Sequence, residues 1–179
     1  MNTEKNRYLD QQFISSELFV STIKSNPAYY KVVFKKIAEE PENMKAIVNG
    51  NLIKKQKSRF NWPAAVFGPL WYAYRKMWRM AFLLLAISIA LFTFIDLGSS
   101  KTSGFGNYGL MLIVAIFWMH HIGSYANSAY FRFMQLILHN SNEDAEVELY
   151  AGTSWTAVAV VLVIEIIAQT ILSQALSLQ

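Results

Sequence analysis

The chain has no cysteine, and it is poor in charge. Without cysteine there is no disulfide framework, no cysteine-based zinc site and no thiol nucleophile. Charged residues make up 16% and hydrophobic residues 54% of the 179 positions. Typical soluble domains have about 25% charged and about 45–50% apolar residues. The shortage of charge indicates contact with lipid rather than an unusually large soluble core.

Basic residues are almost missing from the second half of the chain. Residues 1–79 hold 14 of the 16 lysines and arginines and 6 of the 12 acidic residues. This leaves 2 basic and 6 acidic residues for positions 80–179. A basic half beside an apolar half favours an anionic lipid surface as partner, and we expect no nucleic-acid binding. The first residues, MNTEKNRYLDQQ, lack the apolar core of a signal peptide, so the first hydrophobic helix is expected to direct insertion.

Residues 1–59 are predicted to form a small helical region on the cytoplasmic side. Leu9, Phe13, Ile14, Leu18 and Ile23 recur at roughly helical spacing. Asn26-Pro27 is a typical helix start, and one face of the following helix carries Tyr30, Val33, Phe34 and Ile37. Pro41 to Gly50 is expected to add a third short segment. Because about 50 residues bury little core alone, we expect this region to rest on the membrane, on the remainder of the chain or on a partner.

Residues 60–179 are predicted to form an all-α membrane domain with three spans, at about 78–97, 108–129 and 152–175. The first predicted span has 20 residues, and about 20 are needed to cross a hydrocarbon core of about 30 Å. The acidic stretch 139–148 is expected to be a loop or a helix end. Lys54, Lys55, Lys57 and Arg59 precede the first span together with Arg75, Lys76 and Arg79. The positive-inside rule therefore predicts a cytoplasmic N-terminus.

The segment 60–77 lies directly before the first span and is rich in aromatic residues. Gly68-Pro69 would interrupt a helix near its middle. We expect a surface-lying or re-entrant piece over 60–68, then a helix that starts near Pro69 and runs on into the first span. An interface with anionic lipid is predicted from its aromatic and basic side chains. These are Trp62, Trp71, Arg75, Lys76, Trp78 and Arg79.

Residues 60–78 read FNWPAAVFGPLWYAYRKMW. This stretch resembles the signature of a family of small bacterial inner-membrane proteins of unknown function, whose pattern is Phe-Asn-Trp, Phe-Gly-Pro-Leu-Trp and Tyr-Arg-Lys-Met. An upstream tyrosine pair matches Tyr29-Tyr30, and a later Ala-Asn-x-x-Tyr element matches Ala126, Asn127 and Tyr130. The resemblance covers roughly residues 28–135. The chain departs from it at Ala65-Val66, where the family has aromatics, and in a longer N-terminal extension. The resemblance implies a multi-pass protein of a bacterial inner membrane and no particular chemistry.

Glu165 is the ionisable residue that most needs an explanation, because it lies near the centre of the third predicted span. A charge at this depth costs at least about 2.5–3.5 kcal/mol and usually faces a protein interior. Matching the centres of the second and third spans brings His120, His121 and Glu165 to similar depth. Two readings stay open for the polar cluster: helix–helix hydrogen bonding, or proton or ion relay. The predicted cluster consists of Glu165, His120, His121, Ser124, Asn127 and Gln169.

These patterns predict a membrane protein without enzymatic activity. No catalytic, cofactor-binding or metal-binding residues are assigned, and adjacent histidines point about 100° apart on a helix. The expected role is an adaptor or assembly subunit that binds other membrane proteins or itself. The alternative is a small oligomeric transporter or channel that uses the Glu/His cluster for proton- or ion-linked flux.

Overall fold

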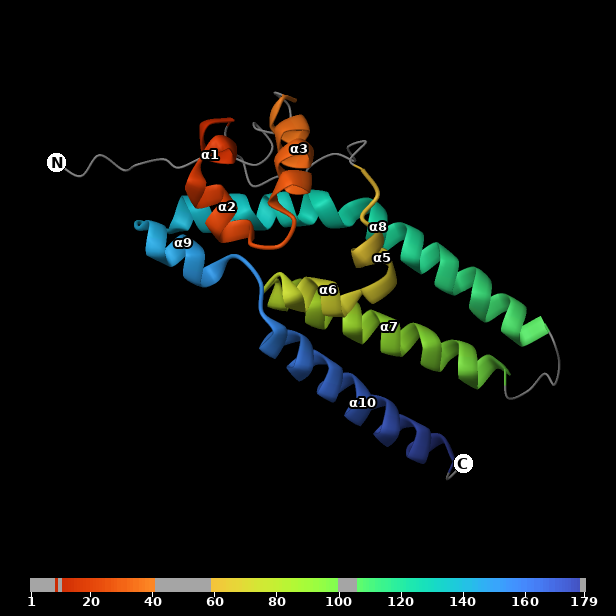
Figure 1. Ribbon diagram of the computed structural model, residues 1–179. Helices are drawn as coiled ribbons and strands as arrows, with labels where there is room; N and C mark the ends of the chain where they lie inside the picture. Colours follow the sequence, from red (N-terminus) through yellow and green to blue (C-terminus); the bar gives the residue numbers. More distant parts are fainter. Residues whose placement is uncertain (1–8, 10, 41–58, 100–105, 178–179) are drawn as a thin grey trace. The chain divides into compact units, whose positions relative to one another are not determined.

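The computed structural model describes residues 9, 11–40, 59–99 and 106–177, and all of its regular elements are helices (Figure 1). The predicted segment from Pro41 to Gly50 and the lysines at 54–57 lie outside the described residues. The chain folds into two compact packing units. One unit combines the chain up to Asn61 with Ser124–Thr153, and the other combines Trp62–Gly123 with Ser154–Gln179.

Among its described residues, the N-terminal region contributes three helices to the first unit: α1 (Gln11–Ser15), α2 (Glu17–Ile23) and α3 (Pro27–Ala38). Side-chain caps fix where two of them begin. Ser16 Oγ accepts from the Phe19 amide at 3.2 Å, and Asn26 Oδ1 accepts from the Tyr29 amide at 3.4 Å. Each cap satisfies an amide that has no partner inside the helix. The predicted start at Asn26-Pro27 is confirmed.

The N-terminal helices pack on the C-terminal half of α8 (Gly106–Asn140), beside which Figure 1 shows them. The Phe34 ring is the centre of this core. Its centroid lies 5.2 Å from that of Phe131 and 5.6 Å from those of Tyr30 and Tyr130. The predicted inner face of α3 is fully buried, as are the α8 residues opposite it. These α8 residues are Ala126, Tyr130, Phe131, Met134 and Leu138.

Helix α8 therefore extends well beyond the predicted second span of 108–129. Its 35 residues measure about 52 Å at about 1.5 Å per residue, against a hydrocarbon core of about 30 Å. The stretch 139–148 is a helix end followed by a further helix, α9 (Asp144–Tyr150). Ser21 Oγ of α2 donates to Glu148 of α9 at 2.5 Å, and the Leu9 amide donates to Gln135 of α8 at 2.7 Å. The N-terminal region thus rests on the remainder of the chain, one of the three supports expected.

The second unit contains α5 (Trp62–Phe67), α6 (Pro69–Tyr74), α7 (Trp78–Ser99), the N-terminal half of α8 and α10 (Trp155–Ser177). The predicted interruption at Gly68-Pro69 is confirmed: Gly68 has a φ of +47°, which favours glycine. The Ser154 amide donates to the Tyr74 carbonyl at 2.8 Å, and the Tyr74 and Trp155 rings lie 5.0 Å apart. These contacts join the start of α10 to the end of α6.

The helix expected from Pro69 into the first span is in fact two helices, and this prediction was wrong. The Met77 amide donates to the Tyr72 carbonyl and the Lys76 amide to that of Ala73, both at 2.9 Å. Lys76 has a φ of +59°. This pair of bonds around a left-handed residue is the Schellman motif that ends helices. The chain therefore changes direction between α6 and α7.

In the described part of the chain, three helices are long and apolar enough to cross a membrane, as predicted: α7, α8 and α10. Each of the three helices exposes several large apolar side chains, as expected for helices that face lipid.

Candidate functional site

One face of α10 points inward while the remainder of the helix is exposed. Ala157 and Val161 are buried, and Glu165 continues the same face four residues later, where it is half-buried. Apolar side chains cover the other faces: Val160, Leu162, Val163, Ile164, Ile166, Ile167 and Ile171 are exposed. The one carboxyl group of α10 is therefore on its protein-facing side, as polar residues at membrane depth usually are.

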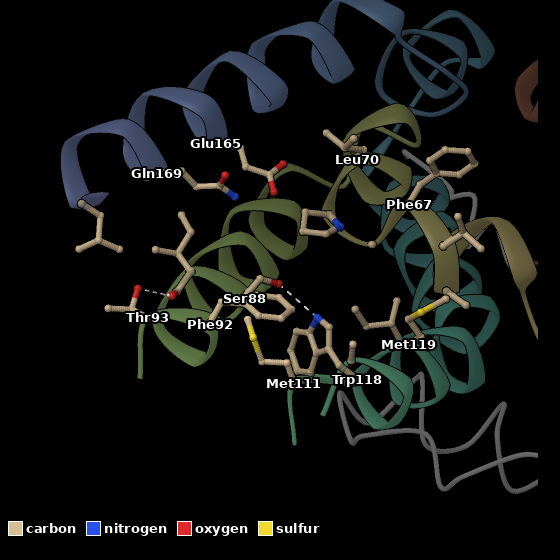
Figure 2. Close-up of a pocket in the computed structure, with 18 of the residues that line it drawn as sticks. Phe67, Leu70, Ser88, Phe92, Thr93, Met111, Trp118, Met119, Glu165 and Gln169 are labelled. Carbon is tan, nitrogen blue, oxygen red and sulfur yellow. Dashed lines mark hydrogen bonds between the residues drawn. The ribbon is translucent and has the colours of Figure 1, made fainter. Parts of the chain in front are cut away.

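Glu165 and Gln169 face a cavity of about 630 Å³ within the second unit (Figure 2). The α5–α6 turn, α7, α8 and α10 all contribute to its wall. Figure 2 shows Phe67 and Leu70 at one end and Phe92, Met111 and Trp118 along the floor. The wall is mostly apolar and partly open. The volume is in the range of small-molecule sites, about 300–1,000 Å³.

The side-chain hydrogen bonds of the cavity's described residues lie within α7 or between α7 and α8, and they do not include Glu165 or Gln169 of α10. Trp118 Nε1 donates to Ser88 Oγ at 3.2 Å, and Thr93 Oγ1 donates to the Ile89 carbonyl at 2.7 Å. Within the part of the chain that the structure describes, Glu165 and Gln169 have neither a hydrogen bond nor an ion pair. These two side chains are therefore polar groups of α10 that could bind a ligand in this cavity.

The predicted polar cluster is only partly assembled here. Glu165 and Gln169 share the cavity, but the lining includes neither His120 nor His121, and both histidines are exposed. Helix α8 turns Met111, Ala115, Trp118, Met119 and Ile122 to the cavity. His120 is rotated by about 100° from Met119. The His121 ring stacks on Phe117 instead, at a centroid distance of 6.4 Å.

Ser124 and Asn127, the other two predicted members, belong to the first unit. Asn127 is buried, and both ends of its amide are bonded. Its Oδ1 accepts from Asn61 Nδ2 at 2.8 Å, while its Nδ2 donates to Tyr29 Oη at 2.9 Å and to the Arg59 carbonyl at 2.6 Å. These bonds hold together Tyr29, Asn61 and Asn127, one residue from each of three separate elements of the signature. The amide is thus a structural link between the N-terminal region and α8.

The sequence spacing of Tyr29, Asn61 and Asn127 gave no geometric reason to pair them, although each belongs to one element of the family signature. Ser88 and Trp118 of the cavity were missed as well. The signal for Ser88 was its position as a polar residue inside the apolar run of the first span.

The predicted lipid-interface residues divide into exposed and buried sets. Trp62, Trp78 and Arg79 are exposed, and Lys76 is half-buried. Trp71 and Arg75 are buried, and the Arg75 guanidinium carbon lies 5.6 Å from the centroid of the Tyr74 ring. The long Arg75 side chain is thus directed into the unit rather than outward to lipid phosphates. Across the described ranges, no group of three His, Asp or Glu side chains could hold a metal ion.

A comparison with protein families matches residues 12–135 to the family described as "Protein of unknown function (DUF2628)". The match covers more than half of the chain. The chain belongs to this family. No curated protein and no solved structure matches it. Both the Asn61–Asn127 link and most of the cavity lie inside the family match, whereas Glu165 and Gln169 follow it.

Proposed function

We propose that this DUF2628 protein is a non-enzymatic adaptor or assembly subunit of a bacterial inner-membrane complex. The observation that supports this role is the preformed N-terminal layer, α1 to α3, on the C-terminal half of α8. Aromatic packing around Phe34 and the bonds of Asn127 hold the layer against α8. A layer that is ordered beforehand loses little conformational entropy when it binds another protein.

The outer face of α3 is the proposed docking surface. Lys31, Lys35 and Lys36 are exposed on it together with Val32, which is 53% exposed. These positions follow one another at helical spacing on the side opposite the buried Tyr30 and Phe34. A partner with acidic side chains around a small apolar patch fits this surface.

The proposed orientation has the N-terminus in the cytoplasm, on the positive-inside argument. Anionic lipids are proposed to contact the exposed Trp62 at the start of α5 and the exposed Trp78 and Arg79 at the start of α7. Exposed aromatic and basic side chains beside an apolar helix suit the headgroup region.

In-cell crosslinking of the tagged full-length protein at native expression tests the adaptor role. A stoichiometric partner should be recovered with wild type and with Glu165→Gln, and it should be lost with Lys31→Glu/Lys35→Glu. Unchanged amide exchange in α3 of the charge-reversed protein would show that the layer is still folded. Recovery of the same partner after charge reversal contradicts the proposed docking surface.

A second candidate function is proton- or ion-linked transport, favoured by one observation: Glu165 and Gln169 face a cavity without a partner in the described chain. Flux into proteoliposomes would then be lost in Glu165→Gln and retained in Lys31→Glu/Lys35→Glu. The adaptor role predicts the reverse sensitivity to these two variants.

A further inference from the structure

The cavity of the second unit combines a few polar side chains with a mostly apolar wall, and this combination specifies a ligand. Its polar side chains are Ser88, Thr93, Glu165, Gln169 and Ser173. Thr93 is bonded to its own helix, and Ser88 already accepts a hydrogen bond from Trp118. The carboxyl group of Glu165 is the strongest acceptor that is still available.

The charge of the lining is of one sign. Glu165 is its single ionisable residue, and no lysine, arginine or histidine is among the described residues that line the cavity. A phosphate or carboxylate headgroup would therefore meet no cation and one like charge. An ammonium group would meet a carboxylate, an amide oxygen and nearby aromatic rings, and aromatic faces also attract cations. Charge complementarity thus selects a cationic headgroup.

The rest of the wall selects an apolar tail. Side chains such as Ile89, Phe92, Met111, Met119 and Leu172 surround the remaining space. The cavity lies among three helices that are long and apolar enough to span a membrane, so a ligand could enter from the lipid. Two methionines on the α8 side suit a tail of variable shape, because their thioether chains adapt to irregular surfaces.

We propose that this cavity binds a single-chain lipophilic amine, with its ammonium group at Glu165 and Gln169 and its hydrocarbon chain between α7 and α8. This ligand site goes beyond the adaptor role, and it does not depend on which partner the N-terminal layer binds. Such a ligand gives Glu165 a charged partner at a depth where an isolated carboxylate is costly.

Photo-labelling in lipid nanodiscs tests the site with the full-length protein. The probe is dodecylamine with a diazirine in its chain, and mass spectrometry identifies the labelled residues. The expected labels lie on α7 and α8 residues of the lining. Dodecylamine should compete with the probe at least about tenfold better than dodecanol or dodecanoate, because a charge-assisted hydrogen bond is about twice as strong as a neutral one.

Three variants distinguish recognition of the ammonium group from recognition of the hydrocarbon chain. Glu165→Gln keeps the shape of the side chain and should remove the preference for the amine. Ala115→Phe places a ring in the cavity and should abolish labelling by any probe. Leu162→Ala changes an exposed position on α10 and should leave both labelling and preference unchanged.

Equal competition by amine and alcohol in wild type would overturn the proposal, because the cavity would then recognise only a hydrocarbon chain. Stronger competition by dodecanoate would overturn it as well. Absence of labels from the lining, with the protein folded, would also overturn it, because the space would then be closed to a lipid-borne amine. None of these results bears on the crosslinking test of the N-terminal layer.

Discussion

The side-chain amides of Asn61 and Asn127 meet at 2.8 Å, although 66 positions separate them in the chain. Asn61 donates and Asn127 accepts, while the other end of the Asn127 amide donates to Tyr29 and to the Arg59 backbone. Asn127 is completely buried and Asn61 is 2% exposed. Satisfied polar groups in such a position define one arrangement of the backbone, because any shift leaves a buried donor or acceptor without its partner.

Replacing Asn127 by alanine should lower the free energy of unfolding of the first unit by about 1–3 kcal/mol, since buried partners lose their bonds. Thermal unfolding in non-ionic micelles and amide exchange of α3 measure the effect. Asn142→Ala, at an exposed position, should change stability by less than about 0.5 kcal/mol. Equal free energies of unfolding for the two variants would show that the hydrogen bonds of Asn127 do not stabilise the first unit.

Gly152 holds the chain between α9 and α10 close to the end of α2. Its φ is +90°, and a Cβ at this position would lie 2.9 Å from the Thr22 carbonyl oxygen. Gly152→Ala should therefore destabilise the first unit by about 1–3 kcal/mol. Gly109→Ala is the matched control, because nothing lies within 4 Å of its Cβ and the residue is inside α8. We expect Gly109→Ala to be slightly more stable than wild type. Comparable melting temperatures for Gly109→Ala and Gly152→Ala would contradict the close approach of Gly152 to the Thr22 carbonyl.

Lys76 is the left-handed residue that ends α6. Such a backbone costs a residue with a Cβ roughly 1–2 kcal/mol, whereas glycine adopts it freely. Lys76→Gly should therefore be more stable than Lys76→Ala by about 1 kcal/mol. Both variants remove the same charge, so the comparison isolates the backbone from any contact with lipid. Thermal unfolding of the two proteins side by side measures the difference, and a more stable alanine variant would refute the assigned turn.

Burial raises the pKa of the Tyr72 phenol well above its ordinary value. The folded state therefore keeps its proton at a pH where the unfolded state has released it. The contribution of the protonated Tyr72 phenol to the free energy of unfolding is therefore complete below about pH 10. Above that pH it decreases by at most about 1.4 kcal/mol per pH unit. Stability measured from pH 8 to 11 should fall less steeply for Tyr72→Phe than for wild type. Parallel curves would exclude Tyr72 as a source of the alkaline dependence.

The sequence alone determined the elements that depend on local chemistry or on summed hydropathy. Three apolar runs predicted the three long helices, since a span requires only enough consecutive apolar residues. Asn26-Pro27 predicted the start of α3, because the cap and the proline act on their own helix. The inner face of α3 followed from helical periodicity in the same way. The depth of Glu165 in its span also indicated a side chain that faces the protein.

The tertiary structure decided which residues meet. Spacing along α8 indicated the depth of His120 and His121, but rotation of the helix turned Met119 to the cavity instead, because neighbouring positions differ by about 100°. The α6–α7 break depends on two backbone bonds around Lys76, for which the lysine itself gives no signal. Asn127 found its partners in residues far away along the chain. Hydrogen bonds between distant residues depend on the packing of whole helices, which no local pattern records.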